Sequence, residues 1–385
     1  MMNAVRKGLE VTAETFSISS RLPVWTGGFP NMDMAELGWN ATLQDQLDSY
    51  GLEDINVGRI YRIDRSEFGV LTADGELSAR LSGKLRTFES ARDHPTVGDW
   101  VLVKTIGKNN TIFAVLDRSS VISRKAPGKV TGEQLIAANV DLVFIVMGLD
   151  NDYNLRRLER YLTMVMGARI RPVVILNKTD LMDRGDPRMD EIKEAALGVN
   201  VHFISAKAGA GIKGLRRYFK KGVTIVLVGS SGAGKSTIIN TLLGFEKQKT
   251  SEVRGSDSKG RHVTTRREMF ILPEGGIIID NPGIREVQLW GEPTNMDDAF
   301  PDIANLALGC RFKNCQHISE PDCAVKEAVT SKALDGKRYD NYLKMKKEML
   351  NLAMRADKGG ETFQRQRWKG IHKGVKQYYK YKKEG

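Results

Sequence analysis

The sequence has few cysteines, few aromatic residues and no long apolar run. Only three cysteines occur among 385 residues, so it lacks the disulfide framework of a small secreted protein. No eighteen consecutive apolar residues are present, which predicts no transmembrane helix. Residues 2–21 contain no continuous apolar core, so we expect no secretory signal. These absences predict a cytoplasmic protein without membrane contact.

The chain is strongly basic. Its formal net charge is +12 and its isoelectric point is near 9.4, which points to a polyanionic partner. Residues 331–385 hold 16 Lys and Arg against 6 Asp and Glu. Aromatic residues are interleaved there, and charge combined with stacking rings suits RNA contact. A solvated basic tail is the alternative. These aromatic residues are Trp368, Tyr378, Tyr379 and Tyr381.

Residues 229–236 (Gly-Ser-Ser-Gly-Ala-Gly-Lys-Ser) match a phosphate-binding loop. Backbone N–H groups of such a loop converge on phosphate oxygens at the positive end of the following helix. Lys235 reaches the β- and γ-phosphates, and the Ser236 hydroxyl ligates magnesium. An apolar strand is expected at 223–228 and a helix at 236–243.

Residues 177–180 (Asn-Lys-Thr-Asp) follow the apolar run 172–176 and form a guanine-reading motif. A carboxylate at Asp180 accepts hydrogen bonds from N1 and N2 of guanine, a pattern that adenine does not offer. Asn177 is expected to contribute to the same specificity. Residues 205–207 (Ser-Ala-Lys) follow a second short strand and are expected to offer a backbone N–H to the guanine O6. Together with the phosphate loop, the motif favours GTP over ATP, and over a P-loop kinase or ATPase.

Magnesium and the γ-phosphate require further groups downstream. Asp280 ends an apolar strand and is expected to hold magnesium through water, while the Gly283 N–H meets the γ-phosphate. A threonine in the basic loop 260–265 completes the magnesium shell when GTP is bound. Thr265 is favoured over Thr264. The alternative interpretation is an exposed basic loop that does not bind magnesium.

The catalytic water has no obvious partner next to Gly283. Ile284 stands where many Ras-like GTPases have Gln, so another group must orient the water. His262 in the switch loop is the candidate catalytic residue alongside Lys235; a structural or RNA-contacting histidine is the alternative. The residues predicted to bind GTP are Asn177, Lys178, Thr179, Asp180, Ser205, Ala206, Lys207, Gly229, Ser230, Ser231, Gly232, Ala233, Gly234, Lys235, Ser236, Thr237, Asp280 and Gly283.

The three cysteines lie close together with one histidine. Cys310, Cys315, His317 and Cys323 form a Cys-x4-Cys-x-His-x5-Cys pattern. Three thiolates and one imidazole fill a tetrahedral shell with no open position, which predicts one structural zinc ion per chain. Three free buried thiols are the alternative.

The motifs occur in an inverted order, because the base-reading motif precedes the phosphate loop by about fifty residues. In an ordinary GTPase the phosphate loop comes first. Permuted order followed by the Cys-Cys-His-Cys site resembles the circularly permuted, ribosome small-subunit-dependent GTPase A family, over roughly residues 37–330. Asn281 departs from that family's usual threonine, and the first 35 or so residues look like an extension.

The strand pattern predicts three folded parts. Short strands between residues 56 and 116 predict a small barrel, either an OB-fold or an SH3-like barrel, preceded by a helix over 37–53 that includes Trp39. Alternating apolar strands and amphipathic segments from residue 141 predict a parallel α/β sheet. A basic helical end follows. The expected domains are 1–36, 37–120 (OB-like barrel), 121–293 (circularly permuted P-loop GTPase) and 294–385 (zinc-binding and helical).

The resemblance implies a function. Members of that family hydrolyse GTP late in the maturation of the small (30S) ribosomal subunit and are stimulated by that subunit. We therefore expect GTP, GDP, magnesium, the subunit and its rRNA as ligands or partners, and a monomer. Release from the subunit is expected to follow hydrolysis. Only 26 residues separate Gly283 from Cys310, so a change at the γ-phosphate is expected to reach the zinc segment and the basic tail. The alternative is a constitutive rRNA-binding module whose guanine-nucleotide pocket is structural.

Overall fold

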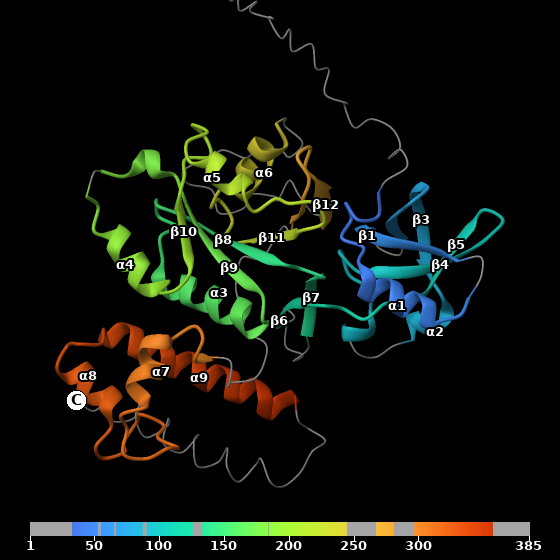
Figure 1. Cartoon of the computed structure of the whole chain (residues 1–385). Helices are drawn as coiled ribbons and strands as arrows, with labels where there is room; N and C mark the ends of the chain where they lie inside the picture. Colours follow the sequence, from blue (N-terminus) through green and yellow to red (C-terminus); the bar gives the residue numbers. More distant parts are fainter. Residues whose placement is uncertain are drawn as a thin grey trace, which may run out of the picture.

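A computed structural model describes residues 33–52, 55–64, 67–87, 91–125, 133–183, 185–244, 267–280 and 296–356. It contains a small barrel, a parallel sheet flanked by helices, and a C-terminal helical part (Figure 1). Within these residues, no helix combines the length and apolar character needed to cross a membrane.

The N-terminal part is a closed five-stranded barrel. Its strands run in the order β1-β2-β3-β5-β4, and β4 pairs back to β1. Only β3 and β5 are parallel neighbours. This Greek-key closure is the OB-fold arrangement, so it decides between the two predicted barrels. The strands are β1 (Asn56–Asp64), β2 (Glu67–Thr72), β3 (Gly75–Leu81), β4 (Trp100–Ile106) and β5 (Asn109–Val115), with the short helix α2 (Gly83–Arg86) and the 3-10 turn η1 (Ala91–Asp93) between β3 and β4.

The first helix is shorter than predicted. α1 spans Ala41–Ser49, and the Asn40 side chain caps it by accepting a hydrogen bond from the Leu43 N–H at 3.1 Å. Trp39 therefore precedes the helix, and the prediction that the helix contains it was wrong. An N-cap asparagine favours a break before the first turn. Trp39 instead packs edge-on against the fully buried Trp100 of the barrel, with ring centroids 4.9 Å apart.

A buried arginine fastens the barrel to its surroundings. Arg59 of β1 donates to the backbone carbonyls of Leu37 (2.6 Å), Gly98 (3.0 Å) and Asn139 (2.9 Å). Burial lowers the pKa of its guanidinium to about 10, although Asp141 and Asp99 oppose that effect. The three carbonyls come from segments before, within and after the barrel, so one side chain holds them together.

The larger sheet has the order β10-β9-β8-β11-β13-β12, in which only β12 is antiparallel. Its central strand, β11, comes fourth among these strands in the sequence, which is the permutation that the motif order predicts. β12 also pairs with β1 of the barrel at Glu268 and Arg62. The strands are β8 (Leu142–Gly148), β9 (Arg171–Asn177), β10 (Asn200–Phe203), β11 (Thr224–Val228), β12 (Glu268–Ile271) and β13 (Ile277–Asp280).

Helices cover both faces of this sheet (Figure 1). Alternate residues of β8 belong to two separate cores: Val143 and Ile145 pack in the core shared with α3, and Leu142 and Phe144 in the core shared with α5 and α6. Continuous apolar strands are expected for a sheet buried on both sides. The helical segments are α3 (Leu155–Gly167), the 3-10 turn η2 (Thr179–Leu181), α4 (Arg188–Ala195), α5 (Ile212–Arg216) and α6 (Lys235–Leu243).

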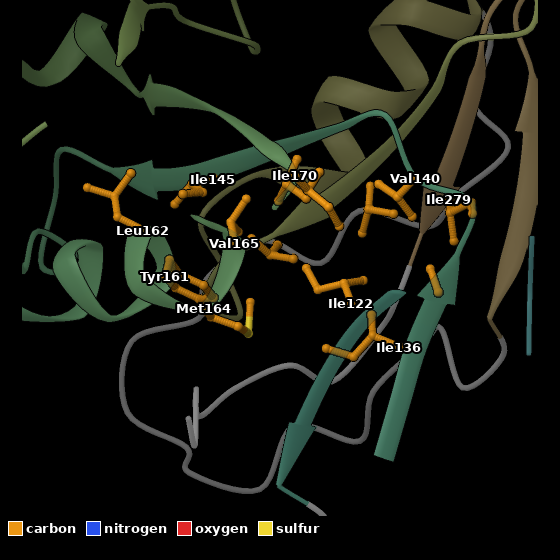
Figure 2. Close-up of a cluster of buried hydrophobic side chains, with 14 of the residues drawn as sticks. Ile122, Ile136, Val140, Ile145, Tyr161, Leu162, Met164, Val165, Ile170 and Ile279 are labelled. Atoms are coloured by element: carbon orange, nitrogen blue, oxygen red, sulfur yellow. The ribbon is translucent and has the colours of Figure 1, made fainter. Parts of the chain in front are cut away.

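A two-stranded ribbon, β6 (Val121–Lys125) and β7 (Glu133–Ala138), connects the barrel to the larger sheet. Figure 2 shows its apolar side chains, Ile122 and Ile136, beside Met164 and Val165 of α3. All four are buried. The ribbon therefore covers one side of the apolar core that contains the α3 side chains.

The C-terminal part packs below α3. It consists of α7 (Pro301–Ala307), α8 (Ala324–Thr330) and α9 (Gly336–Ala356). α9 lies alongside α3 (Figure 1). α7, α8 and α9 agree with the helical end that the sequence predicts.

Candidate functional site

The phosphate loop connects β11 to α6 at the carboxyl end of the central strand. Its glycines are required by geometry at two positions. Gly229 has φ +147°, and a Cβ there would meet the Val146 carbonyl oxygen at 2.1 Å. Gly234 has φ +98°, and a Cβ there would lie 2.0 Å from Nδ2 of Asn177. Glycine accepts such backbone conformations at little cost. The loop therefore folds tightly against β8 on one side and the 177–180 motif on the other.

Lys235 is folded back onto its own loop. Its ammonium donates to the carbonyl oxygens of Gly229 (2.8 Å) and Ser230 (2.7 Å). Burial lowers the pKa of this amine, while Asp280 and Asp152 act to raise it. The two carboxylates favour the charged form of the amine, and its place at the start of α6 suits the binding of an anion.

Asn177 joins three loops through one side-chain amide. Its Nδ2 donates to the Ala233 carbonyl of the phosphate loop (2.9 Å), and its Oδ1 accepts from the Ala206 N–H (2.9 Å). The side chain is buried. Both polar atoms of the Asn177 side chain therefore form hydrogen bonds within the protein, whereas the sequence motif predicts that this residue contributes to recognition of the base. It holds the base motif, the 205–207 turn and the phosphate loop in register.

Asp180 is exposed and lies next to the 205–207 turn. One of its carboxylate oxygens accepts a hydrogen bond from the Ser205 hydroxyl. The Thr179 N–H donates to the Ile204 carbonyl at 3.1 Å. Lys178 adopts the left-handed conformation, with φ +69°. The predicted base motif and the Ser-Ala-Lys segment are therefore adjacent at the ends of β9 and β10.

Two aspartates in the turn after β8 contact the site, and neither was predicted from the sequence. Asp150 pairs with the Lys178 ammonium. Although burial alone would raise its pKa, the hydrogen bond from Lys178 keeps the pKa below its usual value. Asp152 accepts from the Ser230 hydroxyl and from the Gly148 N–H (3.0 Å). The only sequence signal is their place after an apolar strand, where ligand loops of open α/β sheets occur.

The remaining predicted site residues divide into two groups. Asp280 ends β13 beside Leu227 of β11 and is buried, while Ser236 and Thr237 lie in the first turn of α6. The predicted residues His262, Thr264, Thr265 and Gly283 lie outside the described residues.

A second candidate site lies between α7 and α8. The ligand atoms of Cys310, Cys315, His317 and Cys323 all lie within 4.8 Å of one another. Nδ1 of His317 is 3.5 Å from the sulfurs of Cys310 and Cys323. Three thiols and one imidazole nitrogen converging on one point are a donor set for a metal ion.

Hydrogen bonds between side chains and backbone groups hold the loop around this cluster. The Glu320 carboxylate accepts from the N–H groups of Gln316 (2.9 Å), Ile318 (2.9 Å) and Ser319 (3.0 Å). The Tyr339 hydroxyl of α9 donates to the His317 carbonyl. His317 takes a left-handed conformation, with φ +62°. The residues present thus fit a metal ion whose ligands are oriented by their neighbours.

Comparison with known proteins places the chain among related sequences and folds. A family model described as RsgA GTPase matches residues 115–290. The chain is 38% identical over 356 residues to the small ribosomal subunit biogenesis GTPase RsgA of Syntrophotalea carbinolica, covering 90% of this chain and 98% of that relative. It is 39% identical over 347 residues to the protein of the same name from Methanosarcina acetivorans, covering 89% and 93%.

Two solved structures share the fold. The crystal structure of YjeQ from Thermotoga maritima matches with a TM-score of 0.58 and 26% identity, covering 77% of this chain and 99% of that one. The structure of YloQ, a circularly permuted GTPase, matches with a TM-score of 0.55 and 23% identity, covering 77% and 96%. The predicted fold class, a permuted P-loop GTPase domain with an N-terminal OB-like barrel, is confirmed.

Proposed function

Because the chain belongs to the RsgA GTPase family and is a GTP hydrolase, we propose that it acts in late maturation of the small (30S) ribosomal subunit. The subunit stimulates hydrolysis, and the protein leaves the subunit afterwards. The main support is that relatives named for small ribosomal subunit biogenesis match about nine tenths of the chain. The protein works in the cytoplasm as a monomer, and rRNA is its polyanionic partner.

The nucleotide lies across the carboxyl ends of β11 and β9. Backbone N–H groups of 229–236 bind the phosphates, and Lys235 exchanges its two carbonyl partners for phosphate oxygens. Asp180 reads the guanine N1 and N2, while Asn177 acts indirectly by holding the three loops together. The oxygen donors of Ser236 and Asp280 suit magnesium, which neutralises phosphate charge when bound. His262, Gly283 and one of Thr264 and Thr265 keep their predicted roles.

The domain boundaries proposed from the sequence, 1–36, 37–120, 121–293 and 294–385, draw support from the strand limits. The barrel strands run from Asn56 to Val115, and the larger sheet begins at Leu142. The ribbon β6–β7 lies between them and packs on α3, which supports assigning it to the GTPase domain.

The metal at the cysteine cluster is zinc, one ion per chain, with a structural role. We expect Cys315→Ser to lose the zinc and unfold the segment around α7 and α8, because binding free energy at such a site is folding free energy. Metal analysis and circular dichroism measure both effects. GDP affinity should stay within about threefold, since the phosphate loop leads into α6, which packs in the core on the opposite face of the sheet from α3; equal zinc content in the variant would contradict the assignment.

Sedimentation with purified small subunits tests the proposed function. A non-hydrolysable GTP analogue should favour binding and GDP should favour release, because we expect only the γ-phosphate of GTP to order the loop 260–265 and the turn 280–283. Binding should weaken steeply between about 50 and 200 mM salt, as phosphate contacts release counterions. Removing residues 359–385 should weaken subunit binding more than GDP binding.

The alternative function is a constitutive rRNA-binding module with a structural nucleotide pocket. It predicts equal sedimentation in the analogue and GDP states, together with subunit-independent turnover. The presence of Lys235, Ser236 and Asp280 favours the GTPase over this alternative, since a purely structural nucleotide pocket does not require all three residues. A hydrolysis assay with and without subunits distinguishes the two functions.

A further inference from the structure

Helix α3 begins beside the phosphate loop. Asp152, in the turn before the helix, accepts a hydrogen bond from the Ser230 hydroxyl. The same carboxylate pairs with Arg157 in the first turn of α3, whose guanidinium also donates to the Asp152 carbonyl. The side chain of Asp152 is largely buried, with 12% exposed. A movement of Ser230 would therefore change its contact with Asp152, and through Asp152 the contact with Arg157 at the start of α3.

The side of α3 and the C-terminal part share a buried ion cluster. Glu159 is 1% exposed and accepts from Arg156 (2.7 Å), from Arg338 (2.9 Å) and from the Asn341 amide. Arg338 and Asn341 lie on α9. Arg338 also makes two 2.7 Å hydrogen bonds to Asp302 of α7. One carboxylate of α3 thus organises both helices.

The next position along α3 adds a second ion pair. Arg160 donates to both carboxylate oxygens of Glu348 on α9, at 2.7 and 2.8 Å. Arg156 reaches Asp335, just before α9, at 2.8 Å. Buried charges tolerate little displacement, because a shifted partner leaves an uncompensated charge. The α3–α9 contact is therefore sensitive to small rotations or shifts of α3.

Nucleotide binding changes the charge at the other end of the helix. In the structure Lys235 is satisfied by the Gly229 and Ser230 carbonyls. We expect bound phosphates to replace those carbonyls as partners of the ammonium and to bring negative charge toward Asp152, with more charge from GTP than from GDP because GTP carries the γ-phosphate. Like charges at short distance disfavour each other. The Asp152 carboxylate must then rely more on Arg157 and less on Ser230.

We propose that Asp152, Arg157, the Glu159–Arg338 cluster and the Arg160–Glu348 pair form a link through which the nucleotide state of the phosphate loop alters the docking of α9 on α3. Asp152 acts as a positioning residue in this link. The inference rests on the proposed assignment of 229–236 as the phosphate site. It differs from the route through 283–310 expected from the sequence, because it passes through the side of the GTPase domain rather than along the chain.

Hydrogen–deuterium exchange on the free, full-length protein tests this link without ribosomal subunits. Amides of residues 338–350 should exchange at rates that differ by about fivefold or more between the GDP and GTP-analogue states, the lower end of typical coupling between sites. Asp152→Asn should reduce that difference to less than about twofold while the protein stays folded.

A charge reversal tests the far end of the link. Glu159→Gln removes a buried charge and risks unfolding the domain, so the half-buried pair Arg160–Glu348 is the better choice. Arg160→Glu should abolish the nucleotide-dependent difference, and adding Glu348→Arg should restore it. By reciprocity, Arg160→Glu should also change the ratio of analogue to GDP affinity. Lys193→Gln breaks an exposed pair on α4 (3.0 Å to Asp190) and serves as the matched control without effect.

The outcomes separate this link from the proposed function. Equal exchange of α9 in both nucleotide states of the wild-type protein overturns the link, as does an undiminished difference in both Asp152→Asn and Arg160→Glu. Neither result bears on subunit binding, which sedimentation measures. Loss of nucleotide-dependent sedimentation with normal exchange would instead contradict the proposed function.

Discussion

Replacing Lys235 with alanine is expected to reduce GTP hydrolysis by about 10²–10³-fold or more, the usual cost of removing one preorganised group at a developing charge. In the structure this ammonium is already held at the phosphate loop by two carbonyls and lies near Asp280 and Asp152. Phosphate oxygens replace these two carbonyls as its partners when the nucleotide binds. Single-turnover measurements of GTP hydrolysis, with and without small subunits, give the effect.

Companion variants make this result specific. Ser236→Ala should have a similar effect, because it removes the proposed magnesium ligand. His262→Ala should lower turnover while GDP affinity is spared, as expected for a group that acts mainly in the transition state. Lys213→Ala, an exposed lysine of α5, is the matched control with normal turnover. Lys235→Ala retaining more than about a tenth of the wild-type rate would be incompatible with the proposed role.

Asp180→Asn should transfer specificity from guanosine to xanthosine nucleotides. The carboxylate that accepts from guanine N1 and N2 becomes an amide, which matches the oxygen at position 2 of xanthine. A site built for such hydrogen bonds rejects a base that leaves its polar groups unpaired by about 10²-fold or more. Competition of GDP, XDP and ADP against a labelled nucleotide measures the change.

The structure adds a control for this experiment. Ser205 also donates to Asp180, so Asp180→Asn changes a contact that holds the turn. If the turn stays in place, the variant gains XDP binding. If it does not, the variant loses binding of all nucleotides. Asp183→Asn changes an exposed carboxylate three residues away and should leave the GDP preference unchanged. ADP competing as well as GDP against the wild-type protein would refute the base assignment.

The sequence predicts the strands and the order of the site loops well, because both depend on local signals. Apolar runs such as 172–176 and 223–228 occur as buried strands, and the glycines of 229–236 identify the loop by backbone requirements alone. The barrel strands also lie where turn residues and alternation place them. Its closure was not predictable, since an OB-fold and an SH3-like barrel share the same number of short strands.

Side-chain roles that depend on tertiary contacts escaped prediction. Asn177 belongs to a recognised motif, yet its hydrogen bonds to Ala233 and Ala206 emerge only once three loops meet. Glu159 sits in the amphipathic segment Leu-Arg-Arg-Leu-Glu-Arg, where an acidic residue normally indicates an exposed position. It is buried because Arg338, 179 residues later, compensates its charge. No local pattern carries that information.

The permuted strand order affects how the larger sheet is completed during synthesis. β8, β9 and β10 are made first, yet the edge of β8 pairs with β11, which follows much later in the chain. An unpaired strand edge is a template for association with other chains. In a GTPase that begins with its phosphate loop, the central strand is present before its neighbours. This nascent chain instead exposes an open edge at the middle of its future sheet until residues 224–228 leave the ribosome.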